Sequence, residues 1–100
     1  MWSLWRKPRF INYRLENRGL NFKVAFFEGE IWLTQKQLAE IFGLTVATIN
    51  EHIKKIFKND GYQEEELVKK FPLKAKDGKT YLVNHYHNDI LEALQKRVRH

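Results

Sequence analysis

Residues 11–16 alternate apolar and polar side chains, which is the pattern of a half-buried β-strand. The apolar-rich segments 21–27 and 31–33 are interpreted as a second and a third strand. Residues 17–19 are typical turn residues, and Glu28-Gly29 has the length and composition of a tight hairpin turn. Together these features predict a three-stranded antiparallel meander.

From residue 35 onward the apolar residues follow the period of a helix instead. Thr34 precedes the first helical segment, 35–42, and Gln37 follows three residues later, so the two can form a capping box. Gly43 ends this helix, because glycine accepts the left-handed conformation required there. Thr45 can cap a second helix that runs to about residue 58.

The last forty residues predict a short helix, a hairpin and a final helix. Residues 63–69 carry three glutamates near the start of a short helical segment, where the helix dipole favours negative charge. Residues 71–75 and 80–83 flank Asp77-Gly78, a strong two-residue hairpin signal. Residues 88–98 place an apolar stripe on one side of a helix, made by Ile90, Leu91, Leu94 and Val98.

Residues 35–54 have the spacing of a helix-turn-helix. Ala39 is small enough for a close helix crossing, and Gly43 permits the bend. Apolar residues that can lock the two helices together surround these positions: Leu38, Phe42, Leu44, Ile49 and Ile53. His52 occupies a position where an apolar residue is more usual.

In such a motif the second helix enters the major groove of DNA by its N-terminal end. The residues expected to contact bases are Thr45, Val46, Ala47, Thr48 and Asn50. An asparagine can bind adenine through two hydrogen bonds, and threonine can bond to any base. Further along the same helix, Lys54, Lys55 and Lys58 are expected to contact phosphates, which position the protein without reading sequence.

The hairpin predicts a basic wing. A two-residue turn at Asp77-Gly78 would pair Lys76 with Lys79 and Lys74 with Tyr81, so that the three lysines share one face. Like charges directly opposite each other destabilise a sheet, and phosphate contact would relieve that cost. The alternative is a solvated face on which lysines merely discourage edge-to-edge aggregation.

Overall charge favours a polyanionic partner. The chain has 100 residues, a formal net charge of +6 and a pI of about 9.7. The first ten residues carry Arg6, Lys7 and Arg9 and are expected to form a basic arm that follows phosphates or a minor groove, the alternative being a frayed end. No apolar run is long enough to span a bilayer, and the chain has no cysteine. We therefore expect a cytoplasmic protein that has no membrane association and needs no cofactor.

Candidate chemistry is sparse. His85 and His87 would lie on one side of an extended segment and could begin a metal site, but no third ligand is evident in the sequence. The simpler interpretation is two polar residues at a strand-to-helix junction. No phosphate-binding glycine loop, nucleophile elbow or zinc-protease motif occurs. The sequence therefore predicts a protein that is not an enzyme, and a metal-dependent enzyme remains a third hypothesis.

The residues of the helix pair resemble a known family. The run 31–43 (IWLTQKQLAEIFG), the run 48–53 (TINEHI) and Ile56-Phe57 are similar to the virulence-associated RhuM family, as are Phe71, Tyr86, Asp89, Ala93, Arg97 and Val98. This family occurs in bacteria and mobile elements, and its N-terminal region is regarded as DNA-binding. Its members are usually several hundred residues long. The chain departs from the family at Glu92, Gln95 and Lys96, where more apolar residues are expected.

The expected fold is therefore α+β: a winged helix-turn-helix with an N-terminal antiparallel β-meander and a C-terminal helix. Residues 1–10 would form the arm, and residues 11–100 a single domain. The expected function is sequence-specific binding of double-stranded DNA, as in transcription regulation. The alternative is a protein–protein interaction module that does not bind DNA. The sequence leaves open whether the chain forms a homodimer, since helix-turn-helix proteins often read two half-sites as dimers.

Overall fold

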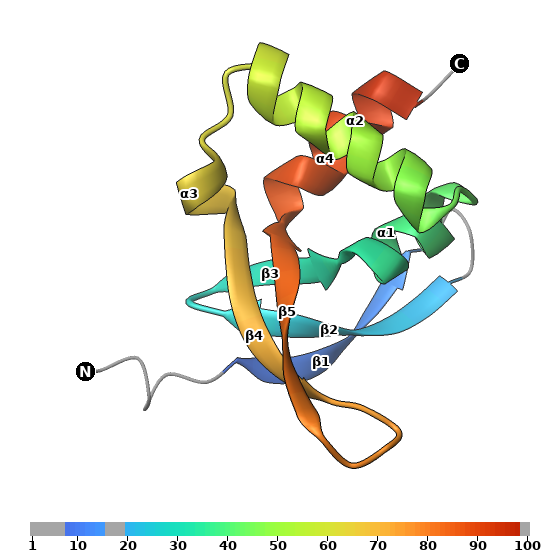
Figure 1. The fold of residues 1–100 in the computed structure, drawn as a ribbon, viewed down its shortest axis with the longest axis vertical. Helices are drawn as coiled ribbons and strands as arrows, with labels where there is room; N and C mark the ends of the chain where they lie inside the picture. Colours follow the sequence, from blue (N-terminus) through green and yellow to red (C-terminus); the bar gives the residue numbers. More distant parts are fainter. Residues whose placement is uncertain (1–7, 16–19, 99–100) are drawn as a thin grey trace.

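The computed structural model describes residues 8–15 and 20–98, and it is an α+β structure. In this part of the chain four helices accompany one open, antiparallel, five-stranded sheet whose strand order is β1-β2-β3-β5-β4 (Figure 1). The elements in chain order are β1 (Arg9–Leu15), β2 (Leu20–Phe27), β3 (Glu30–Thr34), α1 (Gln35–Phe42), α2 (Val46–Asn59), α3 (Glu64–Leu67), β4 (Val68–Lys74), β5 (Thr80–His87) and α4 (Asn88–Val98). None of the described helices is long and apolar enough to cross a membrane.

The predicted meander is confirmed. Strand β1 pairs with β2 and β2 pairs with β3, both antiparallel. Phe27 faces Glu30 across a two-residue turn in which Glu28 and Gly29 have φ angles of 53° and 79°. Two positive φ angles match the right-handed twist of the strands, which is why this turn type favours short hairpins. The turn predicted at 17–19 lies outside the described residues.

The predicted boundaries of the first two helices are also confirmed. The Thr34 hydroxyl accepts a hydrogen bond from the Gln37 backbone N–H at 3.1 Å, and the Gln37 side chain accepts one from the Thr34 N–H at 3.0 Å. Gly43 ends α1 with a φ of 66°. The Thr45 hydroxyl caps α2 by accepting from the Thr48 N–H. Each end of the short connection is therefore fixed by a local hydrogen-bonding device.

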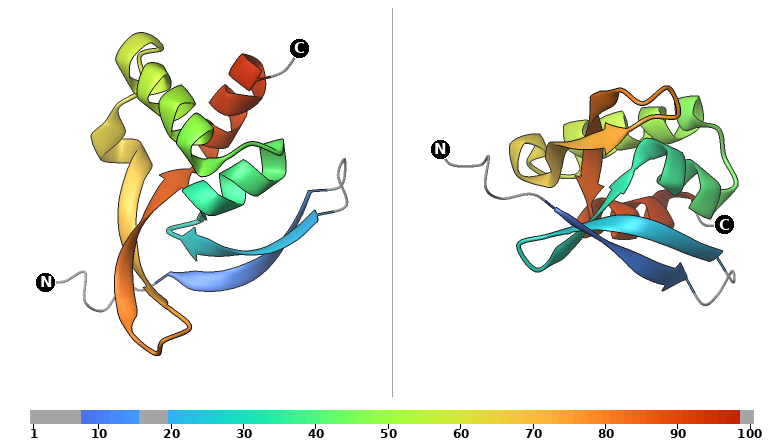
Figure 2. Two further views of the ribbon diagram at one scale, coloured as in Figure 1. Left: turned by 45° about the vertical axis from the view of Figure 1, so that its right-hand side comes forward. Right: turned by 90° about the horizontal axis from the view of Figure 1, so that it is seen from below.

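The main core lies between the helices and one face of the sheet. Leu38, Ala39, Ile49 and Ile53, four of the residues expected to join α1 to α2, are buried there together with residues of α4. Val24, Leu33 and Tyr86 contribute from β2, β3 and β5. Figure 2 shows α1, α2 and α4 gathered on the same side of the strands.

A second, smaller cluster lies on the other face of the strands. It contains Ala25, Trp32 and Phe71, with Phe27 packed against it. The ring centroids of Phe27 and Phe71 are 5.1 Å apart, and those of Trp32 and Phe71 are 6.1 Å apart. Phe71 is on β4 and the other three are on β2 and β3, so this cluster holds the β4–β5 hairpin against the meander.

The hairpin departs from its predicted register by one residue. Lys74 pairs with Thr80 and Leu73 with Tyr81. The Ala75 N–H donates to the Lys79 carbonyl at 2.8 Å, and the Gly78 N–H donates to the Ala75 carbonyl at 3.0 Å. The connection is therefore a three-residue loop, 76–78, with Gly78 at a φ of 87°. The two predicted pairs, Lys76 with Lys79 and Lys74 with Tyr81, are wrong.

Asp77 explains the longer loop. A two-residue turn would require Asp77 as well as Gly78 to adopt a positive φ, but Asp77 is not among the described residues that do so. Its carboxylate instead accepts hydrogen bonds from the Lys79 N–H and the Tyr81 hydroxyl, both at 2.9 Å. These two bonds, the backbone one first, hold the pKa of Asp77 below its ordinary value.

The strands of this hairpin are also longer than predicted. Strand β4 begins at Val68 rather than residue 71, because the preceding helix α3 is only four residues long. Strand β5 continues through His87, and its last three residues pair with Trp32, Leu33 and Thr34 of β3. The segment 85–87 is the paired end of a central strand, and α4 begins directly after it, at Asn88, so the two histidines lie at a strand-to-helix junction as predicted.

Candidate nucleic-acid interface

The N-terminal end of α2 stands on the surface. Thr45, Val46, Ala47 and Thr48 are all exposed, and 42% of the Val46 surface is accessible. The inward side of the helix carries Ile49, Ile53 and Ile56, which are almost completely buried. Four of the five residues predicted to contact bases thus lie on an accessible helix end whose opposite side is fixed in the core.

The two threonines at this end are bonded to each other. The Thr45 hydroxyl accepts from the Thr48 backbone N–H at 3.1 Å and lies 3.0 Å from the Thr48 hydroxyl, to which it donates. A hydroxyl has one donor and two acceptor positions. Thr45 therefore serves mainly to cap the helix, whereas Thr48 keeps its own proton for another acceptor.

Asn50 is less accessible than predicted. It is half-buried, and its Oδ1 accepts a hydrogen bond from Nε2 of Gln35 at 3.0 Å. The same Gln35 nitrogen donates to the Tyr86 hydroxyl at 3.1 Å. Burial raises the pKa of Tyr86, so the hydroxyl stays protonated. A bidentate contact to adenine would have to share the Asn50 carbonyl with Gln35, and the contact stays a prediction.

Two adjoining hollows separate α2 from the β4–β5 hairpin. The first lies at the start of both α1 and α2 and is lined by Lys36, Val46, Lys70 and Leu82, among others. The second follows α2 and is lined by Lys54, Lys58 and one acidic residue, Glu64. Gln35 and Asn84 line both hollows. We call these two adjoining hollows together the lysine groove and define its basic residues as Lys36, Lys54, Lys58 and Lys70.

The other predicted phosphate contacts on the hairpin and helix lie outside this groove. Lys74, Lys76 and Lys79 are exposed. Lys74 shares a hairpin face with Lys70, because alternate residues of a strand point the same way. Lys76 lies within the loop and Lys79 beside it, so the structure does not place the three hairpin lysines on one face of a ladder. Lys55 lines a separate hollow on the outer side of α2, with Ala47 and Thr48.

The predicted arm is only partly described. Arg6 and Lys7 lie outside the described residues. Arg9 belongs to β1 and is exposed, and its guanidinium carbon lies 5.9 Å from the centre of the Phe26 ring. Strand β1 is at the opposite edge of the sheet from β4. Arg9 is therefore not brought together with the lysine groove.

The sequence-based prediction missed Lys36, Lys70 and Leu82. Lys70 was overlooked because β4 was expected to begin at residue 71. Once the strand is known to begin at Val68, the two-residue period places Lys70 on the same face as Lys74. Leu82 was not singled out by the sequence pattern, and in the structure 69% of its surface is exposed.

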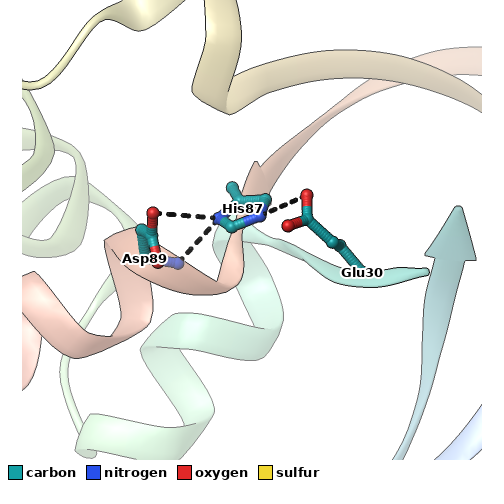
Figure 3. Close-up of polar contacts among 3 residues, drawn as sticks. All are labelled: Glu30, His87 and Asp89. Atoms are coloured by element: carbon teal, nitrogen blue, oxygen red, sulfur yellow. Dashed lines mark hydrogen bonds and ion pairs between the residues drawn. The ribbon is translucent and has the colours of Figure 1, made fainter. Parts of the chain in front are cut away.

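The two histidines of β5 have structural partners, and Figure 3 shows those of His87. Nδ1 of His87 accepts a hydrogen bond from the Asp89 backbone N–H at 2.9 Å, which caps the start of α4. Nε2 therefore carries the proton and lies 2.6 Å from a carboxylate oxygen of Glu30. In the part of the chain that the structure describes, no group of three or more potential ligands is placed to hold a metal ion.

His85 is the more deeply buried histidine, with 1% of its surface accessible. Its Nδ1 lies 2.8 Å from the Val83 carbonyl, to which it donates, and its ring packs edge-on against Phe71. Burial lowers the pKa of His85 below its ordinary value. The charged form is disfavoured because it would lose its hydration in this apolar setting.

This burial makes stability dependent on pH. The unfolded chain takes up a proton at His85 below about pH 6.5, while the folded imidazole stays neutral. We expect the free energy of unfolding to fall as the pH drops from about 7.5 to about 5.5, and to stop falling once the lowered folded pKa is passed. Urea denaturation measures the trend, and NMR titration of the His85 ring measures its cause. A His85 midpoint at or above the ordinary value would contradict this explanation.

No family model, curated protein or solved structure matches the chain. The resemblance to the RhuM family stays a prediction that depends on the residues quoted for it above.

Proposed function

We propose that this chain is a winged helix-turn-helix domain that binds double-stranded DNA in a sequence-specific manner. Helices α1 and α2 form the helix-turn-helix, and the β4–β5 hairpin is the wing. The strand before the helices, β3, pairs with β5, so the wing is attached to the same small sheet from which the helix pair starts. The α4 helix packs behind α2 as part of the core.

The observation that carries this proposal is the accessible end of α2 beside the lysine groove. Figure 2 supports it, because the view from below shows α2 and the hairpin along the same side of the molecule, away from β1 and β2. A duplex lying across this side would meet the N-terminal end of α2 in its major groove. The groove lysines and the exposed lysines Lys55, Lys74, Lys76 and Lys79 would meet the flanking phosphates.

Val46, Ala47 and Thr48 are the most accessible candidates for reading bases. The two apolar side chains can touch thymine methyl groups, and the Thr48 hydroxyl can bond to a base edge. Thr45 and Asn50 would support the same surface, the first as the helix cap and the second through its bond to Gln35. Asn50 can contact a base only if its amide does so while still accepting from Gln35, or if the base replaces Gln35 as its partner.

The direct experiment selects bound duplexes from a random pool and measures affinity for the enriched site by fluorescence anisotropy. We expect Asn50→Ala to lose roughly 1–3 kcal/mol of discrimination at one A·T pair. Asn59→Ala is the matched control, because Asn59 is an exposed asparagine at the other end of α2. No enriched site, or equal discrimination by the parent and Asn50→Ala, would argue against the predicted role of this residue.

A failure to bind any duplex at low salt would refute the function itself. That result would leave the protein–protein interaction module as the remaining alternative. Enrichment of a site with equal effects of Asn50→Ala and Asn59→Ala would instead keep DNA binding and assign the reading to Val46, Ala47 and Thr48.

A further inference from the structure

One face of the hairpin carries an exposed apolar pair between polar and basic neighbours. Pro72 of β4 lies directly opposite Leu82 of β5. Leu82 has 69% of its surface accessible, the most among the exposed large apolar residues of the described chain, and Pro72 is exposed as well. On the same face Lys70 faces Asn84 on one side of this pair, and Lys74 faces Thr80 on the other.

This face belongs to the side on which we place the DNA. Leu82 and Lys70 line the lysine groove together with Val46 of α2. The hairpin end projects away from the helices and the meander (Figures 1 and 2). The opposite face of the hairpin is the one that holds Phe71 against Trp32. The apolar pair therefore points away from the smaller cluster, and it lies on the face whose other end, at Val68 and Tyr86, reaches the main core.

We infer that the hairpin bends DNA, with the Pro72–Leu82 pair acting as a wedge between two base pairs in the minor groove. This inference rests on the proposed function. Proteins that bend DNA from the minor groove insert leucine, proline or similar side chains between base steps and bind the adjoining backbone with basic residues. The hairpin supplies both parts: an apolar pair at the centre and Lys70 and Lys74 at either side.

Charge favours DNA over a second copy of the chain as the occupant of this face. Two copies related by a twofold axis would place the same patch against itself. Lys70 and Lys74 of one copy would then approach those of the other, and like charges at such short range are destabilising. A polyanion is attracted by both lysines and leaves the leucine to contact the base stack.

The experiment measures the end-to-end distance of a short duplex, labelled with a donor and an acceptor dye, upon saturation with protein. We expect the parent to shorten this distance and Leu82→Ala to leave the bound duplex nearly straight. Phe10→Ala is the matched control, because Phe10 is an exposed apolar residue, 42% accessible, on the strand at the other edge of the sheet. It should bend DNA as the parent does.

A second measurement separates wedging from a general loss of contact. Unstacking a base step costs a few kcal/mol, and a mismatch lowers this cost. The parent should therefore bind a duplex with a central mismatch at least roughly tenfold more tightly than the intact duplex. Leu82→Ala should lose the preference for the mismatched duplex. Lys79→Ala should weaken binding to both duplexes but retain that preference.

The outcomes distinguish the two proposals. Binding by the parent without shortening overturns the wedge and leaves DNA binding intact, whereas absence of any binding overturns both. Equal bending by the parent and Leu82→Ala also overturns the wedge. If the free parent sediments as a dimer and Leu82→Ala as a monomer, the leucine belongs to an interface between copies and the wedge is wrong.

Discussion

Raising the salt concentration from about 50 to about 200 mM is expected to weaken duplex binding by roughly 10³- to 10⁵-fold. The proposed interface contains eight lysines, four that line the lysine groove and four exposed ones outside it, namely Lys36, Lys54, Lys58 and Lys70, and Lys55, Lys74, Lys76 and Lys79. Each phosphate that a lysine neutralises releases condensed counterions, and added salt reduces the gain from that release. Fluorescence anisotropy with a labelled duplex at several salt concentrations measures the dependence.

The double variant Lys70→Ala/Lys74→Ala tests whether the hairpin takes part. Removing two phosphate contacts should lower the magnitude of the slope of log affinity against log salt by about 1.8, since each contact contributes about 0.9 for B-DNA. Lys96→Ala is the matched control, because Lys96 is exposed on α4, outside the proposed interface. If Lys96→Ala changed this slope as much as the double variant does, the net charge of the whole molecule, and not the lysines of this groove, would determine the salt dependence.

The helix pair could be predicted from the sequence because its signals are local. Thr34 and Gln37 form their capping box within one turn, and Gly43 adopts the left-handed conformation within the short connection that joins α1 to α2. The exposure of the lysines of α2 could be predicted as well, since the helix has one apolar side and Lys54, Lys55 and Lys58 lie off it. The alternation in residues 11–16 and the turn residues Glu28 and Gly29 likewise predicted the meander.

The hairpin register could not be predicted in the same way. Asp77-Gly78 is compatible with a loop of two or three residues, and the choice depends on where the Asp77 side chain finds donors. In the structure it finds the Lys79 N–H and the Tyr81 hydroxyl, and a shift of one residue turns every side chain to the other face. The candidate site changes accordingly. Lys74 and Tyr81 lie on opposite faces of the hairpin and not on the same face, and Leu82 lies on the face of Lys74.

Tertiary contacts account for the remaining differences. Asn50 was expected to face DNA freely, but it bonds to Gln35, which is fifteen residues away in the chain. Trp32 and Phe71 meet although they are distant in sequence, and Lys69 lies over the Trp32 ring at 5.4 Å from its centre. The period of a single strand cannot show which other strand will cover it. The second cluster was therefore not predictable from the alternation that located the strands.

The second large effect is expected at this cluster. Phe71→Ala should lower the free energy of unfolding by about 3–5 kcal/mol, because it removes a buried ring and leaves a cavity between β4 and the meander. Phe71 has 6% of its surface accessible and packs against Phe27, Trp32 and His85. Domains of this size are stable by only about 5–15 kcal/mol. The loss would therefore be a large part of the total.

Leu82→Ala is the control for this change, since Leu82 is on the same hairpin and faces solvent. Its cost should stay within about 0.5 kcal/mol, as for most surface substitutions. Urea denaturation followed by far-ultraviolet circular dichroism gives both values. Equal costs for the two variants would mean that Phe71 does not hold the hairpin to the meander. A large cost at Phe71 alone would show that the hairpin is fixed by its inner face, which leaves its outer face available to a partner.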